Sequence, residues 1–169
     1  MAKYTIFILL LLLSTPHFAF SESKLEIDVS LSPAGSYKAT TTEVNGSAYK
    51  TADGVAAENI IVNFKNLKTG IGLRDKHTRD RLAVDKYPSA KLVKAIGKNG
   101  KGEAQIDVRG KKIKVKGTYK IEGDKLTAEF PIEISTLDIK DVRYMGVGVK
   151  DTVTVHITVP LEAKRTAKK

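Results

Sequence analysis

The feature that most constrains the fold is a strict two-residue alternation of apolar and polar side chains. Between Lys112 and Ile121, apolar or small residues at odd positions alternate with lysines and one threonine at even positions. Similar alternation occurs over residues 24–31, 126–135 and 149–159. Successive side chains of a β-strand point to opposite faces, so each segment is predicted to be a strand with one buried and one solvated face.

Weaker alternation predicts further strands in the same domain. They fit residues 37–43, 45–51, 58–64, 90–96 and 102–108. Asparagine–glycine pairs at residues 45–46 and 99–100 are typical of tight hairpin turns. Short strands at hairpin spacing, with antiparallel connections, favour a closed barrel or a sandwich.

Residues 70–88 interrupt the alternation. Two pairs of opposite charges spaced four residues apart predict a short helix near residues 75–83. We expect this helix to cover one open end of a barrel, with an inner side formed by Leu73, His77 and Leu82. Tyr87-Pro88 then predicts an extended segment, because the residue before a proline avoids the helical region.

The first residues have the composition of an export signal. Lys3 precedes an unbroken apolar run over residues 6–13, and Ala19-Phe20-Ser21 offers small residues at the two positions that a signal peptidase reads. The run is shorter than the roughly 20 apolar residues that span a bilayer. We therefore predict a cleaved signal peptide over 1–21, a single domain over 22–162, a basic tail over 163–169, and a periplasmic or secreted protein.

The segment around the predicted helix carries a family resemblance. Residues 67–77 (LKTGIGLRDKH) and residues 86–90 (KYPSA) resemble the signature of the YceI-like family, and residues 106–110 and 149–153 extend the likeness more weakly. The resemblance implies an eight-stranded, antiparallel, lipocalin-like barrel that is exported in bacteria. It also implies an interior that binds long isoprenoid chains, such as polyprenyl phosphates or quinones. The sequence departs from the family pattern at Leu82, where phenylalanine is usual, and after Gly110.

The residues themselves are compatible with a ligand inside such a barrel. An eight-stranded barrel is wide enough either to be filled by side chains or to hold one small ligand. Its predicted inner faces include small residues, namely Ala39, Ala48, Ala104, Gly117 and Ala128. They indicate an under-filled interior in which each buried CH₂ of a ligand contributes about 0.8 kcal/mol. The alternative is that small residues fit a tapered and fully packed barrel.

The cluster Arg74-Asp75-Lys76-His77 allows two interpretations. Its cations could hold a phosphate head group, with arginine making a bidentate contact, or its charges could form an ion network that fixes the helix. We favour the structural network. The candidate ligand-binding residues are Arg74, Lys76, His77, Leu82, Tyr87, Leu92, Phe130, Ile139, Tyr144 and Met145.

Composition excludes several kinds of site. The chain has no cysteine, which removes disulfides, thiolate metal sites and cysteine nucleophiles. It has only three histidines, and we expect no metal, cofactor or enzymatic activity. His156 falls on the polar face of its strand and is predicted to be exposed. Export and the lack of interleaved aromatics argue against nucleic-acid binding.

The net charge of +10 predicts a basic exterior, which has two interpretations. Such a surface would be drawn to anionic membranes, or it is simply solvated and resists aggregation. The leading hypothesis is an exported protein that binds an isoprenoid-type amphiphile inside its barrel. The alternative is a non-catalytic envelope stress or surface protein whose packed barrel acts through its basic exterior.

Overall fold

The computed structural model describes residues 22–140, 142–144 and 146–163, without the side chain of Tyr144. The predicted signal peptide, Met145 and residues 164–169 of the predicted tail lie outside the described residues.

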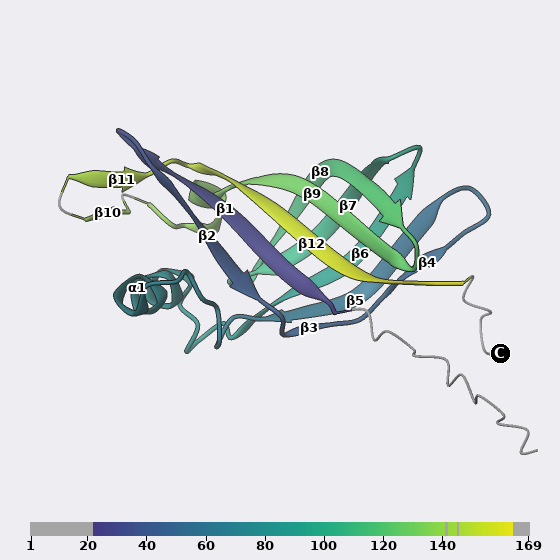
Figure 1. Cartoon of the computed structure of the whole chain (residues 1–169), viewed down its shortest axis with the longest axis horizontal. Coiled ribbons are helices and arrows are strands. Elements are labelled where there is room, and N and C mark those ends of the chain that lie inside the picture. Colours follow the sequence, from purple (N-terminus) through teal and green to yellow (C-terminus); the bar gives the residue numbers. More distant parts are fainter. Residues whose placement is uncertain (1–21, 141, 145, 164–169) are drawn as a thin grey trace, which may run out of the picture.

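The described chain is built mainly of strands (Figure 1). The strands are β1 (Lys24–Ser32), β2 (Ser36–Thr41), β3 (Val44–Asn45), β4 (Ala48–Lys50), β5 (Val55–Asn63), β6 (Ser89–Lys98), β7 (Lys101–Val108), β8 (Lys111–Glu122), β9 (Lys125–Glu133), β10 (Arg143–Tyr144), β11 (Val147–Val149) and β12 (Thr152–Glu162). The helices are α1 (Gly72–Leu82) and the 3-10 helix η1 (Ile134–Leu137). The all-β prediction is confirmed. No helix of this part of the chain is long and apolar enough to cross a bilayer.

Seven strands close into a barrel. Strands β4 to β9 follow one another as hydrogen-bonded neighbours, and β12 pairs with both β9 and β4 to complete the ring. The β12–β4 pairing is parallel, with Leu161 opposite Ala48, whereas the other pairings of the ring are antiparallel. The closed barrel is therefore confirmed, but the prediction of exactly eight antiparallel strands is wrong. Strands β1, β2, β3, β10 and β11 pair outside the ring.

The departure from the predicted eight strands arises in the segment between β1 and β5, because its short strands pair with different neighbours. β2 pairs with β1, whereas β3 and β4 pair with β5. The backbone turns after β2, where the Thr41 hydroxyl accepts a hydrogen bond of 3.1 Å from the Glu43 N–H. It turns again at Gly46, whose φ is +123° and where a Cβ would lie only 2.9 Å from Ile60 Cγ1. The first turn ends the strand predicted over residues 37–43 at Thr41, and the second leaves the short strands β3 and β4 in place of the one predicted over residues 45–51.

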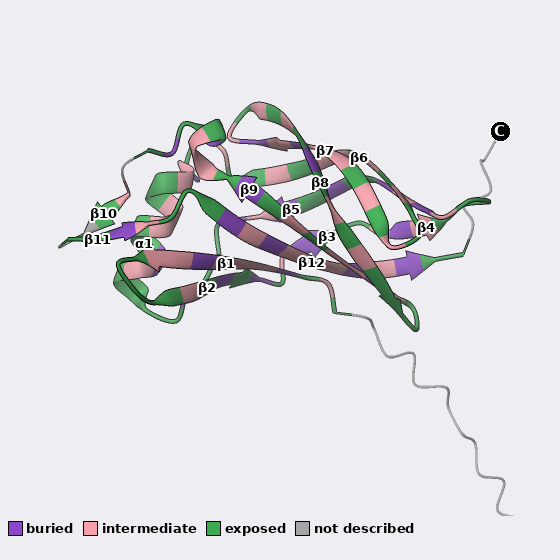
Figure 2. Ribbon diagram, turned by 90° about the horizontal axis from the view of Figure 1, so that it is seen from above, coloured by how far each residue is buried: buried purple, intermediate pink, exposed green. Residues whose placement is uncertain are grey.

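The alternation read from the sequence is visible in the burial of the long strands. Along β12, Val153, Val155 and Val159 are buried, and the residues between them are less so. Figure 2 shows the resulting bands along the ribbons. The core consists of the inward-facing side chains of the barrel together with residues of the connections, such as Leu67 and Val84.

Helix α1 lies at the same end of the barrel as β10 and β11, whereas β4 and the end of β12 lie at the opposite end (Figures 1 and 2). The predicted helix is confirmed, but it begins at Gly72, before the expected start near residue 75. It ends at Leu82, and its C-cap Ala83 adopts a left-handed conformation with φ of 53° and donates its backbone N–H to the carbonyls of Arg79 and Asp80. This arrangement is a common way to satisfy the last carbonyls of a helix.

Candidate ligand cavity

The barrel encloses a cavity of about 1000 Å³. Its walls are the inward-facing and mostly apolar side chains of the barrel strands and of β1 and β2, and its outer end is formed by α1, η1 and the β10–β11 hairpin. Cavities of 300–1000 Å³ lined by apolar groups, with a few polar groups at defined places, are typical of small-molecule sites. The cavity therefore has the size and chemistry to take a hydrophobic ligand.

Small side chains create this space. All five small residues predicted to face inward line the cavity: Ala39, Ala48, Ala104, Gly117 and Ala128. Several inward-facing residues, including Leu92, Ala104 and Phe130, are only half-buried, because the lumen beside them is open to water-sized molecules. The interior is therefore not filled by its own side chains, contrary to the packed-barrel alternative.

Three glycines widen one wall of the cavity. Gly97 of β6 is opposite Gly102 of β7, which is in turn opposite Gly117 of β8, so the three form a row across neighbouring strands. The ring of Tyr119 lies against Gly97, where a Cβ would come within 2.6 Å of its Cε1 atom, whereas a Cβ at Gly102 or Gly117 would meet the carbonyl oxygen of Ile96 or Glu129. Gly97 thus leaves room for this aromatic ring, Gly102 and Gly117 allow close approach of neighbouring backbone, and all three border the cavity.

The mouth of the cavity combines exposed apolar residues with cations. Ile71 and Leu73, at the start of α1, are 54% and 56% exposed, and Val147 of β11 is 38% exposed. All three line the cavity, as do Arg81 of α1 and Arg143 of β10, which are also exposed. We call these five residues the mouth residues.

Asp75 fixes α1 to the barrel. The residue is only 6% exposed, and its carboxylate accepts two hydrogen bonds from Thr69, from the backbone N–H at 2.6 Å and from the hydroxyl at 2.7 Å. The hydroxyl bond first, and the backbone bond second, hold the pKa of Asp75 below its ordinary value. The neighbouring Lys68 exchanges backbone hydrogen bonds with Thr40 of β2. Asp75 thereby ties the helix to a segment that is itself anchored on a strand.

Arg74 has both a structural contact and access to the cavity. Its Nη2 donates a hydrogen bond of 2.6 Å to the Thr69 carbonyl, and its guanidinium carbon lies 4.4 Å from the ring centroid of Tyr37. Its Nε is buried and has no hydrogen-bond partner within the described part of the chain. Arg74 nevertheless lines the cavity, so both interpretations of this cluster apply to it.

Comparison with known proteins identifies the family. A family model for the YceI-like domain matches residues 17–161. The chain belongs to the YceI-like family. The crystal structure of Burkholderia cenocepacia BcnA is similar to it, with a TM-score of 0.57 and 12% identity over 80% of this chain and 96% of that chain. At this identity the likeness shows a shared fold. No curated protein matches the sequence.

The structure brings together six of the residues predicted to bind a ligand in this YceI-like barrel. They line the cavity and are Arg74, His77, Leu82, Leu92, Phe130 and Ile139. Lys76 and Tyr87 are not among the lining residues. The Lys76 ammonium pairs with Asp80 at 3.0 Å, and the ring of Tyr87 lies against Gly110. Tyr144 and Met145 stay predictions, because their side chains lie outside the described part of the structure.

Sequence reasoning overlooked Arg81 and Arg143 at the mouth. Arg81 follows His77 by four residues, so helical periodicity alone would have placed both on the face of α1 that lines the cavity. No sequence signal marks Arg143, because its position depends on the irregular connection between β9 and β12.

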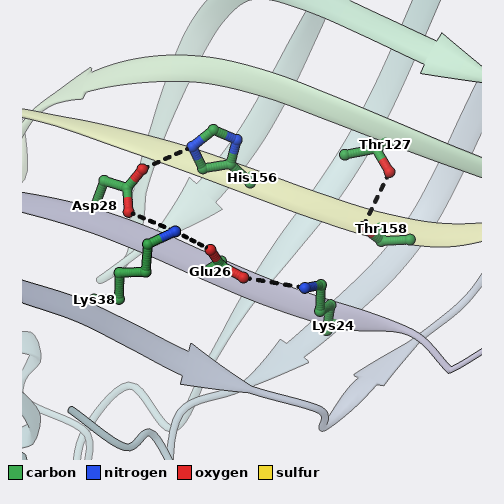
Figure 3. Close-up of polar contacts among 7 residues, drawn as sticks. All are labelled: Lys24, Glu26, Asp28, Lys38, Thr127, His156 and Thr158. Carbon is green, nitrogen blue, oxygen red and sulfur yellow. Dashed lines mark hydrogen bonds and ion pairs between the residues drawn. The ribbon is translucent and has the colours of Figure 1, made fainter.

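His156 differs from the prediction that it would be exposed. It is half-buried, with Nε2 3.0 Å from Asp28 Oδ2 (Figure 3) and Nδ1 3.6 Å from Glu129 Oε2. The neighbouring strands supply these carboxylates, because β12 pairs with β1 on one side and β9 on the other. None of the residues drawn in Figure 3 lines the cavity, so this network belongs to the outer face of the barrel.

Proposed function

We propose that this YceI-like protein is an exported lipid-binding protein that holds an isoprenoid-type amphiphile inside its barrel without transforming it. The observation that carries the proposal is the apolar cavity of about 1000 Å³. Because each buried CH₂ contributes about 0.8 kcal/mol, a long polyprenyl tail would bind tightly through its apolar surface alone. Export rests on the apolar run of residues 6–13 and the small residues that follow it.

The polar groups at the mouth favour an anionic head group. Arg74, His77, Arg81 and Arg143 line the outer end of the cavity, where the head of an inserted amphiphile would remain. An oxygen of the head group would satisfy the buried Nε of Arg74. Arginine binds phosphate with two parallel hydrogen bonds, which supports a polyprenyl phosphate as the first candidate and a quinone as the second.

Organic extraction of the purified protein, followed by mass spectrometry, tests this proposal. The protein should be produced in a host that removes its leader, so that it meets envelope lipids before purification. We expect one polyprenyl phosphate or quinone per chain. The double variant Arg81→Gln, Arg143→Gln should lose phosphate-bearing lipid in preference to quinone. A protein that releases no isoprenoid, and that neither compound protects from thermal unfolding when added, would overturn the proposal.

A further inference from the structure

The segment that leads into α1 carries two large apolar side chains into solvent. Ile71 and Leu73 are each more than half exposed, and they are flanked by Gly70 and Gly72. A Cβ at either glycine would have no atom of the described residues within 4 Å beyond its own neighbours in the chain and the helix, so the segment projects from its surroundings. Exposed apolar side chains grouped beside a binding cavity are typical of an interaction surface.

Neither packing nor helix stability explains Ile71. It occupies the N-cap of α1, where serine, threonine, aspartate or asparagine would satisfy a free backbone N–H, and its side chain makes no capping hydrogen bond. A hydrophobic residue at this position weakens the helix while exposing apolar surface to water. Such a residue is expected where the surface has an apolar partner.

The opposite side of the mouth has the same character. Val147 of β11 is exposed, and Arg81 and Arg143 add positive charge on either side of the opening. Asp80 also lines the mouth, but its carboxylate is paired with Lys76 at 3.0 Å. Among the described residues, neither Arg81 nor Arg143 has an acidic partner. The mouth therefore offers apolar side chains together with cations, which is the combination that complements a bilayer surface carrying anionic phospholipids.

We propose that the protein docks mouth-first on an anionic phospholipid bilayer, with Ile71, Leu73 and Val147 entering the headgroup region and Arg81 and Arg143 meeting lipid phosphates. The purpose of docking, transfer of an amphiphile between bilayer and cavity, rests on the proposed function, but docking itself is measurable without any cargo. The orientation also fits the fold, because β12 ends at the end of the barrel remote from α1 (Figure 1).

The outer wall of the barrel is the competing surface. Lys112, Lys114 and Lys116 of β8 are exposed on it, and a flat electrostatic contact through this wall would place the mouth away from the bilayer. Part of its charge is neutralised, since Lys116 pairs with Glu103 at 2.8 Å. Docking through the mouth and docking through this wall predict different effects of substitutions at the two surfaces, so experiments can distinguish the two modes of docking.

Tryptophan probes separate them directly, because the chain contains no tryptophan. Leu73→Trp and Val147→Trp place a probe at the mouth, and Ile121→Trp places a matched probe at an exposed isoleucine that does not line the cavity. With vesicles of equal phosphatidylcholine and phosphatidylglycerol, we expect blue-shifted emission and quenching by brominated lipid for both mouth probes and not for the control. Vesicles of phosphatidylcholine alone should give weak binding.

Co-sedimentation supplies the second measurement. Arg81→Gln and Arg143→Gln should each lower partition onto the anionic vesicles about fivefold at low salt, whereas Lys112→Gln should change it much less. Ile71→Ser should weaken binding and Ile121→Ser should not. The proposal would be overturned if all three probes were quenched equally or if only the control were quenched. It would also be overturned if Lys112→Gln lowered partition more than Arg81→Gln and Arg143→Gln do, or if the protein bound neither vesicle. Quenching at the mouth of a protein that yields no lipid on extraction would sustain docking while refuting the proposed cargo.

Discussion

Filling the cavity from its own wall should weaken ligand binding while stabilising the empty protein. Ala104 of β7 is the most informative position. It faces inward and lines the cavity, yet it is only half-buried, because open space lies beside its methyl group. Leucine at this position would extend into that space.

The magnitudes follow from the number of carbon atoms added. Alanine to leucine adds three carbons, and at about 0.8 kcal/mol for each buried carbon the substitution stabilises the ligand-free protein by up to about 2 kcal/mol. The same three carbons displace about three methylene-sized groups of ligand, so ligand affinity should fall about 50-fold. Ala48→Leu is the matched control. Ala48 also lines the cavity but is only 1% exposed, and overpacking it should cost about 1–3 kcal/mol.

Urea unfolding of delipidated protein, followed by circular dichroism, measures the stability of each variant, and titration with the extracted lipid measures affinity. Delipidation matters because bound ligand would stabilise the parent protein and hide the effect. Destabilisation by Ala104→Leu comparable to that by Ala48→Leu would show that the lumen is closely packed. Unchanged affinity would show that the lipid binds elsewhere. Either result would refute the reasoning.

Three further substitutions test the elements that shape the cavity. Asp75→Ala should release α1 and lower the stability of the protein at pH 7. The pKa of Asp75 lies below its ordinary 3.8, so the stability that its carboxylate contributes is fully present above pH 3.8 and is lost as the pH falls through the lowered pKa. The urea midpoints of parent and variant should therefore converge in acid, and a constant gap between them would contradict this. Gly117→Ala should lower the free energy of unfolding by about 3 kcal/mol, because the new Cβ would lie 2.1 Å from the Glu129 carbonyl oxygen. An unchanged thermal midpoint in calorimetry would refute this close approach. Ile71→Ser should stabilise α1 by about 1 kcal/mol through a new cap, seen as a higher urea midpoint; a lower midpoint would mean that Ile71 has a packing role.

Much of the fold could be predicted from local sequence patterns. The alternation between Lys112 and Ile121 reappears as β8, and the Asn99-Gly100 turn joins β6 to β7 as expected for a hairpin. The partner change of the chain between β1 and β5 could not be predicted. It depends on the Thr41 hydroxyl and on close approach of Gly46 to Ile60, which are contacts formed only in three dimensions. The early start of α1 was missed because Ile71 gives no capping signal.

The candidate site was predictable in kind but not in detail. Small inward-facing residues indicated free space, and the cavity that they line is present. Its extent depends on Gly97, Gly102 and Gly117 meeting in register across three strands, which follows from strand pairing rather than from composition. The cluster around Arg74 was ambiguous for a physical reason: the same side chain both bonds to Thr69 and borders the cavity.

Native mass spectrometry of the protein purified with its envelope lipids tests the central claim most directly. The parent protein should carry one isoprenoid-sized adduct per chain, and the double variant Ala104→Leu, Ala128→Leu, which fills the cavity from two walls, should be recovered at its bare mass. A bare mass for the parent protein, or an equal adduct on both proteins, would contradict a lipid held within the barrel.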